Sequence, residues 1–343
     1  MEPKFNFQNT KPVAVVAPTV STKLEFTDYL GAIKVRWDIG RNNYRVNPGL
    51  YKVGKPNNQS DVLVSCNYKL SFDHLRKNLS GLNAWILVID TKGVNVWCSA
   101  GKGTFGTLNL VKSIRENALD LMVSHRKIIV PQLAATGVAA HKVMELSGFS
   151  VIFGPVRASD IKPFIEAGYK ATSPMRKMDF PFGERAKLIP VDLMYRKYAL
   201  LGILIGIFFL SGLDKTGFLF SKMAGTCMCP LINILGAYVA GIVLAPLFLP
   251  WTPFRSFSMK GAFWGTVITL LIGLGFKTPL LEWITFLMIN LSISSFMMMN
   301  FTGSSTFTSL SGVQKEMKVA VPLQLIFALL GIALFIVFKL LQP

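Results

Sequence analysis

The chain has 343 residues, enough for two domains, and 51% of them are hydrophobic. That fraction and a mean hydropathy of +0.45 exclude a wholly soluble protein, because the apolar excess is concentrated after Tyr198. The net charge is +18, with 28 Lys/Arg against 15 Asp/Glu in residues 1–198. These basic residues are scattered rather than clustered with aromatics, so we expect a membrane surface and an acidic partner or ligand, and no nucleic acid. Four cysteines without a secretory signal argue against a disulfide framework.

The first 60 residues predict an N-terminal arm and a small β element. Residues 1–22 are polar and contain three prolines, so we expect an irregular arm in which 13–16 adds an edge strand. Weak alternation follows at Ile33, Val35, Trp37 and Ile39, and then comes a turn at 47–49. Alternation with a turn is typical of β structure.

Residues 61–195 predict an α/β domain. Apolar runs and turn signals predict strands at 62–66, 84–90, 127–130, 151–153 and 188–193. Helical periodicity predicts helices at 71–79 with Ser71 as N-cap, 108–123, 139–147 ended by Gly148, and 159–167 ended by Gly168. Strands that alternate with helices favour a doubly wound parallel sheet, which binds ligands at the carboxyl ends of its strands.

The segment Asn95–Lys102 follows the second strand and predicts a short cap helix. Asn95 is a suitable N-cap, which places Cys98 in the first helical turn. The free N–H groups and helix dipole there favour a thiolate, and Lys102 adds a cation one turn later. The alternative is that Cys98 is simply a small core residue.

Other candidate residues follow neighbouring strands. Asn67 and Tyr68 come after the first strand, and Gly137 and Val138 allow a large planar ligand to approach the backbone. Gly154, Arg157 and Ser159 suit phosphate or amide groups, although they also fit an ordinary turn. His141 is expected on a helix surface rather than on a metal. Gly101, Gly103 and Gly106 spell a dinucleotide motif, but they follow a helix, so a nucleotide site is weakly supported.

After residue 196 five apolar segments predict transmembrane helices at 198–213, 230–250, 261–276, 279–300 and 319–341. Ten basic residues flank one side of these segments and four flank the other. The positive-inside rule therefore predicts a multi-pass protein of the inner membrane, with the N-terminal domain in the cytoplasm and the C-terminus outside.

The apolar segments contain almost no charge, only Glu282 and Lys339 near segment ends, which disfavours an ion-coupled transporter. Two sulfur-rich stretches, 227–229 and 297–299, contain residue types that bind soft metals. We expect both to serve packing.

The octapeptide Asn95–Lys102 resembles the cap-helix signature of the HgcA family, the corrinoid proteins of microbial mercury methylation. That signature reads Asn, Val or Ile, Trp, Cys, Ala or Ser, Ala, Gly, Lys, and every position fits. The resemblance covers nearly the whole chain. Residues 61–195 are also similar to the corrinoid domain of the corrinoid iron–sulfur protein of acetyl-CoA synthesis, which has no cysteine in its cap.

The resemblance implies a Rossmann-like corrinoid-binding domain followed by an all-α membrane domain. It implies that Cys98 is the lower ligand of the corrinoid cobalt and that Trp97 packs against the sheet or the ring. The residues implied in corrinoid binding are Asn67, Tyr68, Asn95, Val96, Trp97, Cys98, Ser99, Ala100, Gly101, Lys102, Gly103, Thr104, Gly137, Val138, Gly154, Arg157 and Ser159.

The implied activity is methyl transfer to Hg(II), with methyl groups from a one-carbon pathway. The implied partners are a ferredoxin-like iron–sulfur electron donor and either a methyl-donor protein or methyltetrahydrofolate. Two alternatives remain: a membrane-anchored corrinoid methyl carrier of an acetyl-CoA-type pathway, and a cobalamin-binding membrane sensor or transporter. Cys98 and the apolar segments argue against the first, and the paucity of intramembrane charge argues against transport.

Overall fold

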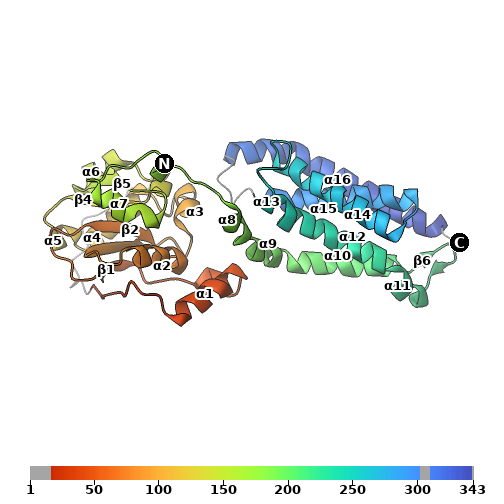
Figure 1. Ribbon diagram of the computed structural model, residues 1–343, viewed down its shortest axis with the longest axis horizontal. Coiled ribbons are helices and arrows are strands. Elements are labelled where there is room, and N and C mark those ends of the chain that lie inside the picture. Colours follow the sequence, from red (N-terminus) through yellow and green to blue (C-terminus); the bar gives the residue numbers. More distant parts are fainter. Residues whose placement is uncertain (1–16, 302–309, 342–343) are drawn as a thin grey trace. The chain divides into compact units, whose positions relative to one another are not determined.

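The computed structural model describes residues 17–301 and 310–341, which form two compact units (Figure 1). The first, which we call the α/β unit, takes in the chain to Val35 and Ile39–Met178. The second, which we call the helical unit, takes in Arg36–Asp38 and the chain from Asp179 onward.

A five-stranded sheet forms the centre of the α/β unit. Its strands are β1 (Gly49–Val53), β2 (Val62–Cys66), β3 (Ala84–Ile89), β4 (Lys127–Val130) and β5 (Ser150–Phe153), in the spatial order β1-β3-β2-β4-β5. β1 pairs antiparallel with β3, and the other neighbours are parallel. Every residue of β2 and β3 is buried, as continuous apolar runs in a sheet covered on both faces require.

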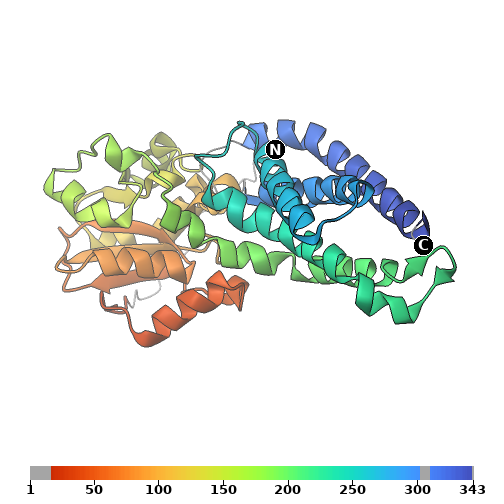
Figure 2. The same ribbon diagram turned by 45° about the vertical axis from the view of Figure 1, so that its right-hand side comes forward.

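Helices cover both faces of this sheet (Figures 1 and 2). α2 (Lys69–Asn78) and α7 (Ile161–Glu166) share one apolar core with the sheet. α4 (Thr107–Glu116), α5 (Leu119–Met122) and α6 (Ala140–Ser147) share the other. The chain leaves β2 for β3 on one side and then crosses to β4 on the other. The strand order therefore reverses between β2 and β4, where such sheets bind ligands.

Three predictions for the α/β unit are wrong. Residues 26–36 form a helix, α1 (Phe26–Arg36), where alternation predicts β structure, and the β element of this region is β1. α2 begins at Lys69, so Ser71 lies inside it and Tyr68 is the N-cap. The helix predicted at 108–123 is interrupted because Ala118 has a left-handed φ of 42°, which ends α4 and starts α5. The strand predicted at 13–16 lies outside the described residues.

The strand predicted at 188–193 is also wrong, because these residues lie in α9 (Ile189–Tyr195) of the helical unit. Pro190 stands in its first turn, where a missing N–H costs nothing, whereas in a strand it would break the ladder. Other short elements among the described residues are η1 (Arg41–Asn43), η4 (Pro174–Arg176), α8 (Phe182–Ala186), β6 (Leu213–Asp214), β7 (Gly217–Phe218) and α11 (Phe220–Thr226).

Four helical stretches among the described residues are long and apolar enough to cross a membrane. They are Met228–Leu247, which joins α12 (Met228–Val239), a π-helical turn and α13 (Ala245–Leu247); α14 (Phe257–Phe276); α15 (Leu280–Asn300); and Gly312–Leu341 of α16 (Leu310–Leu341). The first predicted span corresponds to α10 (Lys197–Leu210), which has 14 residues. It makes a fifth crossing only if α8 and α9 form one span with it across a 58° bend.

Glycines bring α14 and α15 together. A Cβ on Gly265 would lie 2.0 Å from Ser294 Oγ, and one on Gly261 would lie 2.4 Å from Ser294 O. The four-residue spacing of these glycines puts both on one face of α14, so the two backbones pack without side chains between them.

Candidate functional site at the cap helix

The predicted cap helix is present as α3 (Val96–Gly101). The side-chain Oδ1 of Asn95 accepts the amide of Cys98 at 2.9 Å, which confirms Asn95 as N-cap and Cys98 in the first turn. On the inner side, Ser99 and Ala100 are buried, and Ser99 Oγ donates to Asn95 O at 2.6 Å. The inner side of α3 is therefore fixed to the domain.

The outer side of α3 is open. Trp97 is 42% exposed. Cys98 is half-buried, and Gly101, Lys102 and Gly103 are exposed. A Cβ on Gly101 or Gly103 would meet no atom within 4 Å. The sulfur of Cys98 thus lies on a helix whose outer residues border open space.

Asn67 holds the loop that leads into α3. Its Oδ1 accepts the amide and hydroxyl of Thr91, at 3.0 and 2.9 Å, and the amide of Gly93 at 2.9 Å. Its Nδ2 donates to Asp90 Oδ1 at 2.9 Å. The side chain is 3% exposed. Its hydrogen bonds link the carboxyl end of β2 to the loop that follows β3.

Tyr68 is buried beside Asn67. Its ring meets that of Tyr44 edge to face with 6.5 Å between centroids, and the guanidinium of Arg41 lies 5.8 Å from its centroid. These contacts connect the end of β2 to the segment that follows α1.

The loop after β4 supports the cap. It contains η2 (Gln132–Ala134), which contacts α3, and then Gly137 and the buried Val138. A Cβ on Gly137 would lie 2.5 Å from Phe105 O and 3.0 Å from Ala100 O, so glycine is needed there. Gly137 therefore allows the backbone of the cap segment to approach closely. Thr104 also belongs to this packing, with its hydroxyl 3.4 Å from Ser99 O.

Gly154, Arg157 and Ser159 follow β5 at the same edge of the sheet. Gly154 N donates to Val130 O at 2.9 Å, and Ser159 Oγ donates to Asp160 Oδ1 at 3.2 Å within η3 (Ala158–Asp160). β2 and β4 separate β5 from β3, which places this loop about 14 Å from the strand that carries the cap. Only a large ligand would touch both this loop and the cap.

The other thiol and imidazole groups nearby do not form a metal site. Cys66, at the end of β2, is fully buried, and burial raises the pKa of its thiol, as expected of a core cysteine. His141 is exposed on α6, which confirms that it is a surface histidine. The described residues contain no group of three or more His, Cys, Asp or Glu that would hold a metal ion.

The sequence alone did not identify the residues that hold the cap segment and Asn67 in place. Asp90 and Thr91 bind Asn67 directly, and Phe105 is fully buried where the cap segment meets the loop after β4. A signal for the first pair was present: Asp-Thr followed by Lys-Gly directly after a strand is typical of a tight turn that needs side-chain acceptors.

Comparison with known proteins gives matches over the α/β unit. The family model described as the CO dehydrogenase/acetyl-CoA synthase delta subunit matches residues 33–165. The gamma subunit of the acetyl-CoA decarbonylase/synthase complex of Methanopyrus kandleri is 32% identical over 128 residues, 37% of this chain and 27% of that protein. The same subunit of Archaeoglobus fulgidus is 28% identical over 157 residues, covering 45% and 31%. The corrinoid/iron-sulfur protein large subunit of Moorella thermoacetica is 30% identical over 125 residues, covering 36% and 28%.

The α/β unit is therefore homologous, at low identity, to subunits of the acetyl-CoA synthase corrinoid/iron-sulfur proteins. The chain spans between 27% and 31% of the length of these three relatives. The family match includes the whole sheet and the cap, and it ends before Asp179, where the main part of the helical unit begins.

Proposed function

We propose that this chain is a membrane-anchored corrinoid methyltransferase that methylates Hg(II), with Cys98 as the protein ligand of the corrinoid cobalt. The observation that carries the proposal is Cys98 itself: a half-buried soft sulfur ligand in the first helical turn that Asn95 caps, close in sequence to glycines that border open space. The homology to a corrinoid/iron-sulfur protein subunit supports corrinoid as the cofactor.

The residues present fit such a cofactor. A corrinoid would bring most of the ligands of its cobalt with it, so one donor from the protein would suffice, and Cys98 offers one half-buried thiol. The open space beside Gly101 and Gly103 leaves room for a macrocycle, and the loop after β5 gives a second contact for a large ligand.

When bound, a corrinoid would supply the methyl group for transfer to Hg(II), with an external iron–sulfur protein as the source of electrons. The chain has other tasks. Asn95 orients the first turn of α3 and so holds the backbone that carries Cys98. Asn67, through its bonds to the 90–93 loop, holds the base of the cap. The exposed Trp97 would cover part of the ring.

Purified full-length protein tests the proposal when it is supplied with corrinoid, a methyl donor, a low-potential iron–sulfur reductant and Hg(II). Cys98→Ala should keep the fold and much of the corrinoid affinity, since most binding area is the macrocycle, but should form no methylmercury. Cys98→Thr should behave alike. The matched control is Cys229→Ala, which removes a half-buried thiol of the helical unit and should leave methylation unchanged. Full methylation and an unchanged cobalt spectrum in Cys98→Ala would refute the proposal.

A corrinoid methyl carrier of an acetyl-CoA-type pathway is the second candidate, and the named relatives favour it. The same variants separate the two functions. A carrier should pass its methyl group to a carbonyl- or acetyl-forming partner whether or not Cys98 is present, and it should give little methylmercury.

We further propose that the helical unit anchors the chain in the inner membrane with the α/β unit in the cytoplasm, as the basic flanks predict. A reporter active only outside the membrane should give signal after Pro343 and none after Tyr195. The opposite pattern would show that the topology is reversed. Signal from neither position would show that the chain crosses the membrane four times rather than five.

A further inference from the structure

Helix α1 packs on the α/β unit through one face. Asp28 and Val35, which lie 20° apart on a helical wheel, are its buried residues. Gly31, close to the same face, lies so near Tyr44 that an added Cβ would be 2.4 Å from the Tyr44 hydroxyl. This face has no room to shift.

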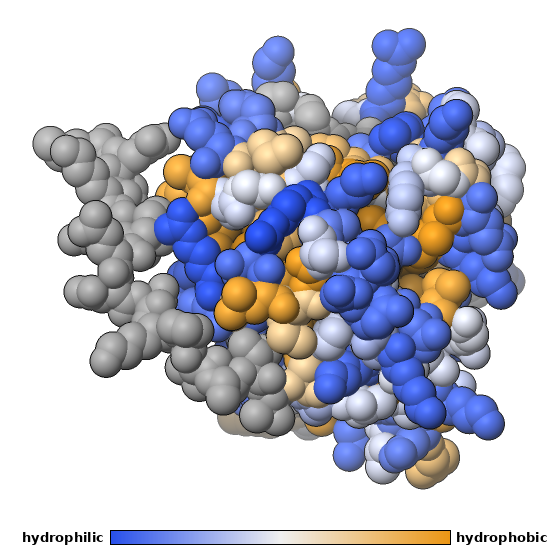
Figure 3. Space-filling model, turned by 90° about the vertical axis from the view of Figure 1, so that its left-hand side faces the viewer, coloured by the Kyte–Doolittle hydropathy of each residue, from blue (hydrophilic) through white to orange (hydrophobic). Residues whose placement is uncertain are grey.

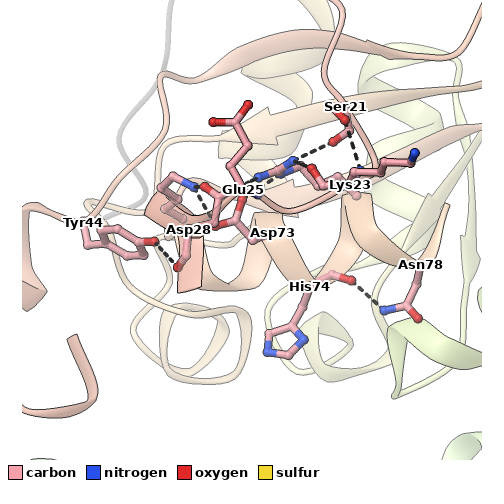
Figure 4. A network of polar contacts seen from close by, with 10 residues as sticks. Ser21, Lys23, Glu25, Asp28, Tyr44, Asp73, His74 and Asn78 are labelled. Atoms are coloured by element: carbon pink, nitrogen blue, oxygen red, sulfur yellow. Dashed lines mark hydrogen bonds and ion pairs between the residues drawn. The ribbon is translucent and has the colours of Figure 1, made fainter. Parts of the chain in front are cut away.

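An ion-pair network fixes the orientation of α1 (Figure 4). The carboxylate of Asp28 bridges two cations of α2, with Oδ1 2.5 Å from Lys69 Nζ and Oδ2 2.6 Å from Arg76 Nη2. Both cations also bind Asp73, at 2.6 and 2.7 Å. Arg76 Nη1 donates to Ser21 O at 2.6 Å, which ties down the chain that enters α1. Since Asp28 and Arg76 are buried, the helix is held against rotation.

The opposite face of α1 is apolar and exposed. Phe26 is 80% exposed, Tyr29 51%, Leu30 40% and Ile33 56%. At 100° per residue these four side chains fall within an arc of about 100°, centred opposite Val35. Lys34 borders the arc on one side and Arg36 on the other. We call this the α1 apolar stripe.

The α1 apolar stripe differs from the rest of the surface of the α/β unit. Hydrophilic side chains dominate the face of the molecule in Figure 3. Elsewhere in the unit exposed large apolar residues stand on separate elements, such as Leu108 on α4, Leu121 on α5 and Met144 on α6. Single exposed residues are ordinary, whereas four on one rigid helix face indicate a binding surface.

We propose that the α1 apolar stripe docks onto the lipid surface of the membrane in which the helical unit is anchored. The inference rests on the proposed anchoring. Aromatic and aliphatic side chains bordered by Lys and Arg are typical of helices that lie in a lipid interface. The α/β unit ends at Met178 and apolar α10 begins at Lys197, so the tether keeps the stripe at high local concentration near the bilayer. Docking would hold α1 at the membrane. Because the ion pairs join α1 to α2, docking would also hold the carboxyl ends of the strands there.

Photo-crosslinking of the full-length protein in nanodiscs with anionic lipid tests the docking. Ile33 is replaced by benzoylphenylalanine, and the matched control carries the same group at Leu121, which is 75% exposed on α5. After irradiation, mass spectrometry should find about tenfold more lipid adduct at position 33 than at 121. Phe26→Ser should lower the adduct at position 33.

Two outcomes overturn docking alone. One is a crosslink from position 33 to protein, whether to the helical unit or to a second copy of the chain, and the other is equal lipid adduct at both positions. Alkaline extraction of the same chain from vesicles reports on the anchoring separately. A chain released by that treatment would overturn the proposed anchoring and this inference with it, whereas a retained chain without adduct would overturn only the docking.

Discussion

Asn67 in the α/β unit and Asn290 in the helical unit are both buried side-chain amides, but they bind different parts of the chain. Asn67 binds backbone amides of the loop after β3, at Thr91 and Gly93. Asn290 Nδ2 donates to side chains of two other helices, Asn233 Oδ1 of α12 at 3.0 Å and Thr269 Oγ1 of α14 at 2.8 Å. Loops between strands and helices leave backbone groups without partners, whereas long helices satisfy their own backbone. A buried amide therefore builds a loop in one unit and joins three helices in the other.

Glycines show the same contrast. Gly137 allows a loop to touch the cap backbone, while Gly261 and Gly265 allow two helices to touch along their length. In the α/β unit the polar and small residues thus set local geometry near the candidate site. In the helical unit they set helix packing. The contrast predicts that substitutions in the two units will affect different properties.

The largest effect is expected from Gly265→Val in the helical unit. The new side chain would overlap Ser294 Oγ and crowd Asn290 O, so α14 and α15 would separate, at a cost on the order of 3 kcal/mol. The control is Gly275→Val on the same helix, where a Cβ meets no atom within 4 Å. Thermal unfolding in detergent should show a lower midpoint for Gly265→Val alone. Equal unfolding of the two variants would show that this contact does not hold the bundle together.

Next comes Asn67→Ala, which should loosen the cap without dissociating the helices. It leaves the backbone amides of Thr91 and Gly93 without their acceptor, at a cost of about 3 kcal/mol, whereas the Thr91 hydroxyl can still donate to Val94 O. Hydrogen exchange should rise in residues 90–102 and stay unchanged in α12 and α14. Asn78→Ala, which removes one amide-to-carbonyl bond within α2, is the control. Faster exchange throughout the helical unit would contradict the separation of roles.

The sequence predicts the strands of the sheet well and α1 badly, for one physical reason. β2 and β3 are buried on both faces, so their apolar runs coincide with the structure. The alternation at Ile33, Val35 and Trp37 is read as a strand on the assumption that apolar side chains of one face point inward. In the structure Val35 is buried while Ile33 and Trp37 are 56% and 43% exposed. An apolar stripe that faces outward violates the assumption, and the pattern then indicates the wrong element.

In the candidate site, too, the sequence predicts some contacts and not others. Asn95 and Cys98 are three residues apart, and their hydrogen bond follows from helix geometry, so the sequence predicts it. Asn67 meets Thr91 across 24 residues, and Gly137 meets the cap only because β2 and β4 are neighbours. Such contacts depend on the order of the strands in the sheet, which residue spacing alone does not determine.

Lowering the pH should release α1 while the helical unit stays intact. Burial raises the pKa of Asp28, but hydrogen bonds from Lys69, the Glu25 amide and Arg76 outweigh burial and lower it to about 2. Because the folded pKa lies below the ordinary value of 3.8, this stabilisation is complete above pH 4 and is lost as the pH falls toward 2. Its size is on the order of 2 kcal/mol. The difference in unfolding free energy between wild type and Asp28→Asn should therefore shrink between pH 6 and pH 3. A gap that does not change with pH would contradict this role of Asp28.

The smallest effect, Asn95→Ala, tests the link between cap geometry and the proposed chemistry. It removes one hydrogen bond to the amide of Cys98, worth about 1 kcal/mol, and leaves the thiol in place. Because Ser99 and Ala100 still bury the inner side of α3, the helix should fray at its first turn rather than unfold. Methylmercury formation should fall partway, and hydrogen exchange should rise at Cys98. Asn95→Asp keeps an acceptor at the same position and should restore most of the loss. If Asn95→Ala were as inactive as Cys98→Ala, the cap would be doing more than orienting the sulfur, and Asn95 would need a direct contact with the cofactor.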